Sequence, residues 1–498
     1  MSTPALVVRL AFGQPPLTSH GAAVWTDVSQ FVEGSDGIEH MIHRGRNHER
    51  DENEAGTAII VLNNKDRYFD RNNSANIAPY AGNIEPMTKI KIGARWPATG
   101  PDIYWMFNGY VESWHPEYPG GTVSTCTLEC VDAFKYLGLN DVHTTSNRQV
   151  ERAVYRIEYI FDSWVYWPAG DRALAVGDVD LAEMPLEGSA LALINQITRT
   201  ERGSFYMSKT GNATFEDRSW RDTATSLATW GGAANGSELP YSSVSIRYDD
   251  SDIFNRIEVT RAGGIKQTVN DAGSQTDYFI RTFSSTGLPY VNDAAALTAA
   301  ETILHRYKDA RTRLDRMVID PGVRDTWLPV LERELSDMIT VKRPTLIDGH
   351  TTTLDGHIEA ITWHITKGMW QCTWQLSPHF AAPTLGWGTM NTTDDWKVPT
   401  LLNSWVNVGT GTNPPAGYRK EGDWIYLRGL VKDGATLTSV ILQLPVGYRP
   451  AFNARFTVPS GSASAQAYVT PAGDVALITG TGGSTASVEL GPIRFKVN

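Results

Sequence analysis

The segment Phe107-Asn-Gly-Tyr-Val-Glu-Ser-Trp114 contains a short motif, Gly109-Tyr-Val-Glu112, that recurs 247 positions later as Gly356-His-Ile-Glu359. A second motif keeps nearly the same spacing, because Cys126-Thr-Leu128 is echoed 246 positions later by Cys372-Thr-Trp374. In each copy we expect a strand, a glycine-containing strand, a turn and a closing strand. Two motifs in the same order at nearly constant spacing predict an internal repeat.

A third, looser match precedes both motifs. Met87-Thr-Lys-Ile-Lys91 is echoed 251 positions later by Met338-Ile-Thr-Val-Lys342. We therefore predict that residues 1–140 and 241–381 are two related β-barrels. Three chains with two similar barrels each can form a ring of six similar barrels. Such a ring would match a partner with sixfold symmetry, while the rest of the assembly keeps threefold symmetry.

The region between the predicted barrels, residues 141–240, changes to a helical period. The apolar residues that recur at this spacing over 146–164 are Val150, Ala153, Val154, Ile157, Ile160, Phe161 and Trp164. Ser189 is a good N-cap for a second helix that ends before Gly203, and a hairpin follows around Lys209-Thr-Gly-Asn212. We predict an α/β insertion domain here.

The second predicted barrel combines strands with one helix. Residues Ile253–Thr260 alternate like a strand, and Asn292 is expected to cap the helix. A final hairpin around Lys367-Gly368 places seven apolar residues on one face, namely Ile361, Trp363, Ile365, Trp370, Cys372, Trp374 and Leu376. Because Thr and Gln alternate with them, we interpret the tryptophan stripe as packed core rather than as a ligand-stacking surface.

The end of the chain has a different character. Residues 382–396 are predicted to be a linker, and residues 397–498 a β-sandwich, because short strands and many turns replace any helical period. Residues 397–498 hold nine Lys and Arg against five Asp and Glu, a net charge of +4, whereas the rest of the chain carries −15. Two differently charged parts indicate two roles.

Composition excludes several classes of protein. The chain has 498 residues, of which 41% are hydrophobic and 20% charged, so it is neither disordered nor fibrous. A net charge of −11 argues against non-specific binding to nucleic acid. Three cysteines exclude a disulfide scaffold, and Cys126 and Cys130 are expected in the core. Without a recognisable signal peptide or a 20-residue apolar stretch, the protein is expected to be made and to fold in a cytosol.

Metal sites have weak candidates only. His40, His43 and His48 lie on what we interpret as a charged strand edge. The stretch Asp70-x-Asn72-x-Ser74-x-Asn76 imitates a calcium loop, but Ala75 stands where such a loop needs Gly, so a solvated turn is predicted. We expect no metal and no cofactor.

Catalytic motifs such as G-x-S-x-G, the P-loop and H-E-x-x-H are absent from the sequence. The repeated Glu112 and Glu359 could form an acid/base pair only if the fold brought them together. Equivalent positions in two barrels favour a structural role instead, such as pairing with an Arg of the neighbouring barrel. We predict that the protein is not an enzyme.

Five stretches together resemble the minor tail proteins of long-tailed phages (siphophages) that infect actinobacteria. They are residues 44–70, from Arg44-Gly-Arg-Asn-His to Asp70; Phe107–Trp114; Leu128-Glu-Cys-Val-Asp-Ala-Phe134; Ile253–Thr260; and Gln375-Leu-Ser-Pro378. The resemblance covers about residues 1–381. This family is similar to the baseplate hub, or tail-associated protein, of phage tail tips.

The resemblance implies a virion protein made in the bacterial cytoplasm and located at the tail tip. Its expected form is a homotrimeric hub that gates the channel below a hexameric distal tail protein ring. The implied partners are that ring, the tape measure protein and other minor tail proteins, with DNA present only in transit. The acidic main body would suit a lumen that does not hold DNA. The alternatives are a hexameric distal tail ring with a carbohydrate-binding appendage, a tail-associated glycan hydrolase and a cellular β-rich adhesin.

The C-terminal sandwich resembles a module of phage tail and fibre proteins, which implies binding to the host surface. The residues that carry this resemblance are Asn403-Ser-Trp-Val-Asn407, Gly417-Tyr-Arg-Lys420 and Leu444-Pro-Val-Gly-Tyr-Arg-Pro450. In the strand from 424 to 428, Ile425 and Leu427 are expected in the core.

The opposite face of that strand is our candidate glycan-binding site, with Trp424, Tyr426 and Arg428 facing outward and Tyr418 and Tyr448 nearby. Flat rings beside a hydrogen-bond donor suit sugar stacking, and a local net charge of +4 would favour anionic envelope polymers. The alternative is that this face contacts a neighbouring subunit.

Overall fold

The computed structural model describes residues 3–119, 123–232, 238–324, 326–344, 351–380, 396–408, 414–421, 424–436, 438–445, 447–461, 463–479 and 487–496. The chain divides into two compact units, Met1–Thr384 and Leu385–Asn498. No helix of the described ranges is both long and apolar enough to cross a membrane.

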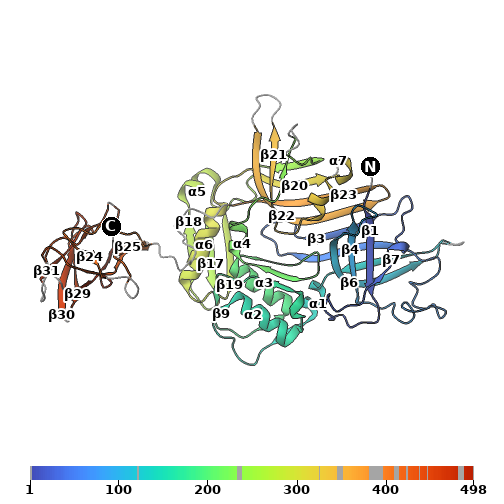
Figure 1. The fold of residues 1–498 in the computed structure, drawn as a ribbon, viewed down its shortest axis with the longest axis horizontal. Helices are drawn as coiled ribbons and strands as arrows, with labels where there is room; N and C mark the ends of the chain where they lie inside the picture. The colour runs from blue at the N-terminus through green and yellow to red at the C-terminus, as the bar shows by residue number, and fades with distance from the viewer. Residues whose placement is uncertain are drawn as a thin grey trace. The chain divides into compact units, whose positions relative to one another are not determined.

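The first unit is built on one large β-sheet (Figure 1). Its first part, called here the first half-barrel, comprises β1 (Ala5–Ala11), β2 (Thr26–Asp27), β3 (His40–Gly45), β4 (Glu54–Asn63), β5 (Thr88–Arg95), β6 (Ile103–Glu117) and β7 (Thr125–Val131). The second half-barrel comprises β15 (Thr229–Trp230), β16 (Ser243–Arg247), β20 (Arg313–Ile319), β21 (Met338–Pro344), β22 (Thr351–Thr366) and β23 (Met369–Pro378). The prediction of a mainly β fold is confirmed.

The two half-barrels share one topology. The first runs in the order β3-β4-β7-β6-β5, and the second runs β16-β20-β23-β22-β21, with every neighbour antiparallel. The motif Gly109–Glu112 lies on β6 and its echo Gly356–Glu359 on the corresponding β22. Likewise Cys126 lies on β7 and Cys372 on β23. The internal repeat inferred from sequence is therefore a repeat of structure.

One of the three sequence matches is displaced by two residues. Ile90 pairs with Gly109, and Ile339 pairs with Gly356, so β5 and β21 correspond at a spacing of 249 rather than 251. The structural equivalent of Met87 is Ser336: both have positive φ, 63° and 72°, and both donate their backbone N–H across 2.7 Å to the next strand. Shifting the alignment of the two sequences by two residues leaves each side chain on the same face of its strand. The apolar pattern therefore still matched when Met87 was aligned with Met338 instead of Ser336.

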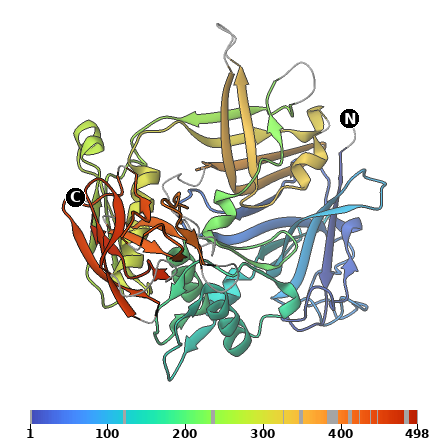
Figure 2. The same ribbon diagram turned by 60° about the vertical axis from the view of Figure 1, so that its left-hand side comes forward.

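The halves join into a single sheet because β22 pairs with β3. The blue strands of the first half-barrel and the orange strands of the second lie side by side in both views (Figures 1 and 2). One hydrophobic core serves both halves, from Ile60 and Leu128 to Trp363 and Trp374. All seven residues of the predicted tryptophan stripe are buried, as are the free cysteines.

An α/β insertion follows β7. It contains α1 (Phe134–Leu139), α2 (Ala153–Ile160) with a π-turn (Phe161–Val165), α3 (Ala190–Glu201) and a sheet of β10 (Arg172–Leu174), β14 (Ala213–Glu216) and β13 (Ser204–Met207). Ser189 caps α3 as predicted, accepting from the Ala192 N–H, and left-handed Arg202 ends the helix before Gly203. The helix expected from 146 starts only at Ala153, because residues 151–152 pair as a strand.

Short elements complete the first unit. They are β8 (Asp141–His143), β9 (Glu151–Arg152), β11 (Asp180–Leu181), β12 (Glu187–Ser189), α4 (Arg218–Asp222), α7 (Pro321–Arg324), α8 (Trp327–Leu331) and the 3₁₀ turns Ser29–Phe31 and Ala169–Asp171.

A second α/β insertion interrupts the second half-barrel. Its sheet is β18 (Gln267–Asn270), β17 (Arg256–Arg261) and β19 (Thr282–Leu288), with α5 (Ala272–Tyr278) and α6 (Asp293–Tyr307). The stretch 253–260, which alternates as a strand should, thus lies in a separate small sheet with its own core against α6. Asn292 caps α6 as predicted.

The second unit is a β-sandwich. One sheet has the order β24 (Val406–Asn407), β27 (Leu430–Lys432), β32 (Val488–Glu489), β29 (Ala454–Ser460), β30 (Ala463–Val469), β31 (Asp474–Thr479) and β28 (Leu442–Gln443). The other contains β25 (Gly417–Glu421), β26 (Trp424–Arg428) and β33 (Arg494–Lys496). Both sheets contribute to one core, for example through Ile425 and Val458.

Candidate functional site: the junction of the two half-barrels

The half-barrels meet where residues 40–45 of β3 pair antiparallel with residues 360–365 of β22. Along one edge, β22 pairs with two strands in succession: residues 351–357 pair with β21, and residues 360–365 pair with β3. The change of partner coincides with a β-bulge, since the register of β22 against β23 shifts between Ile358 and Ala360. Bulges of this kind redirect a strand and end one pairing before another begins.

The glycine of the repeated motif allows close strand approach. A Cβ atom on Gly109 would lie 2.4 Å from the Val131 carbonyl oxygen, and one on Gly356 would lie 2.8 Å from that of Ser377. Val131 and Ser377 are themselves equivalent residues on β7 and β23. Both copies of the motif therefore need a residue without a side chain at this position.

Glu359 is the bulge residue of the second half-barrel, and it is enclosed by three cationic or polar partners. Its carboxylate accepts a hydrogen bond of 2.6 Å from Arg46 Nε, and further bonds from the Arg221 guanidinium and the Ser377 hydroxyl. The side chain is 2% exposed. Arg46 follows β3, Arg221 lies in the last turn of α4, and Ser377 belongs to β23. The carboxylate of Glu359 on β22 therefore bonds to side chains from three other segments.

This arrangement fixes the charge of Glu359. Burial alone would raise the pKa of Glu359, but the charges and hydrogen bonds of Arg221 and Arg46 hold it well below its usual range. Burial works against the charge of Arg221, yet attraction to Glu359 raises the pKa of Arg221. A carboxylate that stays ionised and enclosed cannot donate a proton at neutral pH, so Glu359 does not fit the role of a general acid.

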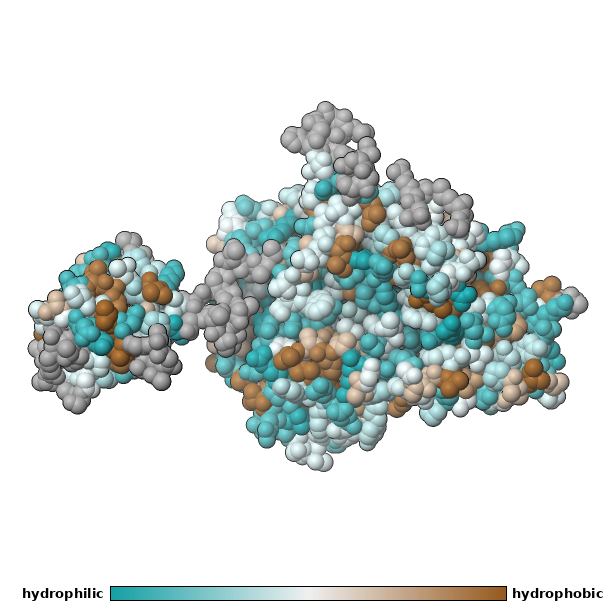
Figure 3. Space-filling view, in the orientation of Figure 1, coloured by the Kyte–Doolittle hydropathy of each residue, from teal (hydrophilic) through white to brown (hydrophobic). Residues whose placement is uncertain are grey.

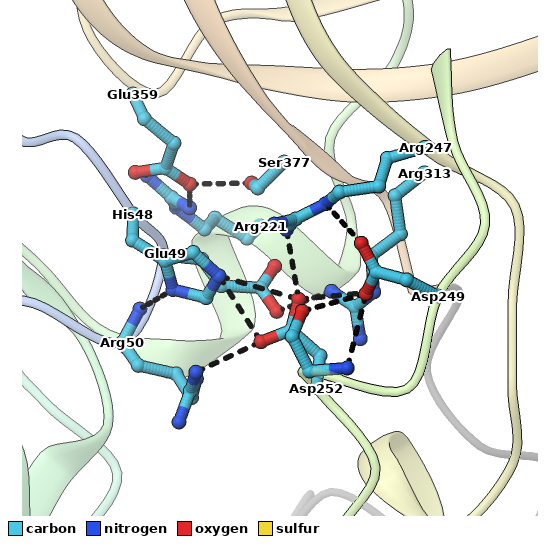
Figure 4. Close-up of polar contacts among 11 residues, drawn as sticks. His48, Glu49, Arg50, Arg221, Arg247, Asp249, Asp252, Arg313, Glu359 and Ser377 are labelled. Carbon is cyan, nitrogen blue, oxygen red and sulfur yellow. Dashed lines mark hydrogen bonds and ion pairs between the residues drawn. The ribbon is translucent and has the colours of Figure 1, made fainter.

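A second buried carboxylate, that of Asp252, forms ion pairs with side chains from both half-barrels (Figure 4). Its oxygens lie 3.1 Å from His48 Nε2, 2.9 Å from Arg50 Nη2 and 3.0 Å from Arg247 Nη2. Burial would raise the pKa of Asp252, but the hydrogen bond from His48 and the charges around it lower it strongly. His48 and Arg50 follow β3, whereas Asp252 and Arg247 belong to the β16 segment. Ion pairs therefore strengthen the junction that the strand pairing forms.

Glu112 is the corresponding bulge residue of the first half-barrel, since the register of β6 against β7 shifts between Val111 and Ser113. Its side chain is 46% exposed and forms an ion pair with Lys135. Among the described residues, 113–117 pair with β7 alone. The side that β3 occupies on β22 is thus an open strand edge on β6. The expected pairing with an Arg of the other half is confirmed for Glu359 and is not formed by Glu112.

The three histidines weighed as metal ligands have different partners. His40 bonds to the Glu33 carbonyl, His43 to the Thr362 hydroxyl, and His48 to Asp252. Within the residues that the structure describes, no group of three or more His, Cys, Asp or Glu is arranged to hold a metal.

The calcium-like stretch is a turn held by its own side chains. Asp70 accepts from the Asn72 N–H at 2.8 Å and from Arg67 Nε at 3.1 Å.

In the second unit, three of the five candidate glycan-binding residues share one face. Ile425 and Leu427 are buried, so Trp424, Tyr426 and Arg428 point away from the core, and Trp424 is 40% exposed. The orientation predicted for this strand is confirmed.

Two further residues on that face escaped the sequence analysis. Arg419 lies opposite Tyr426 in the hairpin register, with its guanidinium 5.6 Å from that ring. The guanidinium groups of Arg419 and Arg428 lie 4.9 and 4.7 Å from the ring of Trp396. The hairpin register would have revealed Arg419, but Trp396 stands in the stretch we assigned to the linker.

Tyr418 and Tyr448 lie elsewhere. Tyr418 is opposite Leu427, so its side chain leaves from the core-facing side of the sheet. Its ring is 5.1 Å from that of Tyr448, whose hydroxyl accepts from Lys397 Nζ at 2.6 Å. Both tyrosines pack against the hydrophobic core of the unit.

No family model and no curated protein matches the chain. Among solved structures, the tail protein from Neisseria meningitidis MC58 aligns with a TM-score of 0.50 at 12% identity, over 75% of this chain and 96% of that one. The chain shares the fold of that tail protein. The 43 kDa tail protein of prophage MuSo2 from Shewanella oneidensis has a TM-score of 0.47 at 13% identity, covering 76% and 98% of the two chains. Prophage tail protein gp18 from Listeria monocytogenes EGD-e has 0.41 at 9%, covering 74% and 94%.

Proposed function

We propose that the protein is a structural component of a phage tail tip, where three copies form a hub of six half-barrels. The observation that carries this proposal is the repeated five-strand unit, present twice in each chain and joined edge to edge. Two related units per chain are what a trimer needs to present six similar surfaces to a sixfold neighbour. The fold shared with a tail protein agrees with this role.

In this role the hub links a distal tail protein ring to the host-binding parts of the tail, and contacts the tape measure protein and other minor tail proteins. Its work is mechanical: it gates the channel and then lets DNA pass. The charge of −15 outside residues 397–498 supports this, because an acidic body does not retain the phosphate backbone.

Averaged electron images of tail tips along the tail axis test the hub. Threefold symmetry with six similar densities in the ring is the expected result. A true sixfold ring with one chain per density would overturn the hub and favour the alternative, a hexameric distal tail ring with a carbohydrate-binding appendage.

We further propose that the second unit binds anionic glycans of the host surface through Trp424, Tyr426 and Arg428, together with Trp396 and Arg419. Aromatic rings interleaved with guanidinium groups offer stacking and charge on one face. Tyr418 and Tyr448 would not contact the glycan directly but would stabilise the sheet from its core-facing side.

Retention of the full chain on a polyglycerol-phosphate resin tests the glycan proposal. We expect Trp424→Ala to reduce retention, while Phe452→Ala, which is also exposed, leaves it unchanged. Equal retention of both variants and the native chain would overturn the assignment of this face.

A further inference from the structure

Two of the open strand edges in the described part of the first unit lie at equivalent places in the two half-barrels' junction geometry, one on β16 and one on β6. β16 is one of the two terminal strands of the large sheet and, within the described residues, pairs only with β20. Residues 113–117 of β6 pair only with β7, because the pairing with β5 ends at Val111. Open edges present unpaired N–H and C=O groups, which makes them templates for another strand.

These two edges are the counterparts of the strands that form the internal junction. Ile60 of β4 and Met317 of β20 are equivalent, since they pair with the equivalent Leu128 and Trp374. The residues just before them, Ile59 and Arg316, are therefore also equivalent. Ile59 pairs with Met41 of β3 and Arg316 pairs with Ser245 of β16, so Met41 corresponds to Ser245. By the spacing of the Gly-x-x-Glu motif, residues 113–117 of β6 correspond to 360–364 of β22. Each chain thus contains one complete junction and the two unmatched halves of a second one.

We propose that β16 of one copy pairs antiparallel with residues 113–117 of β6 in the next copy, so that every joint of the hub repeats the β3–β22 pairing. This inference rests on the trimeric hub proposed above. Transferring the internal register places Arg247 opposite His115, Ile246 opposite Pro116 and Ser245 opposite Glu117. The contact is head to tail, and such a contact closes a ring when its rotation allows.

Burial along the two edges supports this pairing. At the internal junction Ile42, Ile361 and Trp363 are all at most 4% exposed. At the open edges Ile246, which corresponds to Ile42, and Trp114, which corresponds to Ile361, pack against the same core but remain partly exposed. A strand added at each edge would cover them. On the face of the first unit drawn in Figure 3, hydrophobic residues lie in separate groups among mainly hydrophilic ones.

The polar groups at the open edges also suit a joint between copies. Glu117 lies diagonal to Arg247 in the transferred register, close enough to add a charge pair to those that Arg247 forms with Asp249 and Asp252. Lys135 pairs with Glu112, as Arg46 pairs with Glu359 at the internal junction. Pro116 has no N–H to donate, which removes one potential hydrogen bond from the joint. A proline on an edge also restrains indiscriminate strand addition, so this joint is weaker and more selective than the internal one.

Cysteine cross-linking of the full chain tests the register. The double variant Glu117→Cys/Ser245→Cys places the two thiols on directly opposite residues, at a separation compatible with a disulfide. We expect mild oxidation to give covalent dimers and trimers on denaturing gels, with no larger species. Mixing the two single variants should give dimers only. The matched control Glu117→Cys/Ser243→Cys is out of register by two residues and should cross-link at least tenfold less.

Native mass spectrometry of the same samples separates failure of this inference from failure of the hub. A non-covalent trimer that forms no disulfide at residues 117 and 245, or cross-links equally well in the control, overturns the strand pairing and leaves the hub intact. A chain that stays monomeric without cross-links overturns both. Cross-linked species of up to six chains would overturn the trimer but would support the pairing of β16 with residues 113–117 of β6.

Discussion

The same four-residue motif has two different environments in this molecule. In the second half-barrel, Glu359 is buried among Arg46, Arg221 and Ser377 at the place where β3 joins the sheet. In the first half-barrel, Glu112 is nearly half exposed, and Lys135 is its ion-pair partner. Both are bulge residues preceded three positions earlier by a glycine in close contact with the next strand.

This difference indicates that the motif specifies the backbone geometry, whereas the presence of a neighbouring strand determines whether the glutamate is buried and which groups it pairs with. The glycine and the bulge redirect the strand in both halves. Only where a partner strand is present does the carboxylate become buried and need compensating charges. The comparison therefore separates a backbone geometry that both halves share from an electrostatic role that only Glu359 has. The following variants test each of these in turn.

The largest effect is expected for Glu359→Ala. This substitution leaves Arg46 and Arg221 facing each other without their shared anion, and breaking a buried ion pair costs about 3–5 kcal/mol. Urea denaturation followed by tryptophan fluorescence measures the loss. A cost below about 1 kcal/mol would show that the junction does not depend on this carboxylate.

Gly109→Ala and Gly356→Ala probe the shared geometry. Each added methyl group would meet a backbone carbonyl, at 2.4 and 2.8 Å respectively, so we expect losses of about 1–3 kcal/mol, larger for Gly109. Gly232→Ala, where a Cβ atom meets nothing within 4 Å, is the control. If only one of the two variants were destabilised, the motif would not have the same role in both halves.

Acid should remove the contribution that Glu359 makes to the stability of the folded protein. Because the pKa of Glu359 is lowered in the folded protein, its contribution is fully present above the unfolded pKa of about 4.5 and is lost as pH falls below it. Each pKa unit of lowering corresponds to about 1.4 kcal/mol. Thermal melts from pH 3 to 7 should show that Glu359→Gln flattens this pH dependence. An unchanged slope would place the acid sensitivity elsewhere, with Asp252 the next residue to test.

The smallest effect is expected for Glu112→Gln. An exposed ion pair contributes about 0–1 kcal/mol, so unfolding of the isolated chain should change by no more than about 0.5 kcal/mol. The same urea titration used for Glu359→Ala provides the measurement. A loss comparable to that of Glu359→Ala would remove the contrast between the two sites.

Much of the framework could be predicted from sequence because it depends on local signals. Ser189 and Asn292 cap their helices through hydrogen bonds to residues three positions later, which is a short-range property. The alternation over 361–376 predicted a buried face, and all of its apolar residues are buried. The repeat was recognised because Gly109 and Gly356 meet the same backbone constraint.

The junction could not be predicted because its partners are distant along the chain. No local pattern indicates that Glu359 would meet Arg46, or that Asp252 would meet His48 and Arg50. The stretch 253–260 alternates correctly but does not reveal which sheet it joins. Tyr418 was expected near Trp424, yet a one-residue difference in strand parity turns its side chain to the other face.

The distance between β3 and its partner strand also sets the order in which the protein can mature on the ribosome. His43 and Thr362, which hydrogen-bond across the junction, are 319 residues apart. At about 5–20 residues per second, β3 waits roughly 15–60 s for β22 to be synthesised. During that interval β3 can pair with β4, but its other edge stays unpaired in the nascent chain, and contacts of such long range form slowly. The polar residues on this edge, His43 and Arg44 among them, then serve to keep the unfinished polypeptide from associating with others on the same polysome.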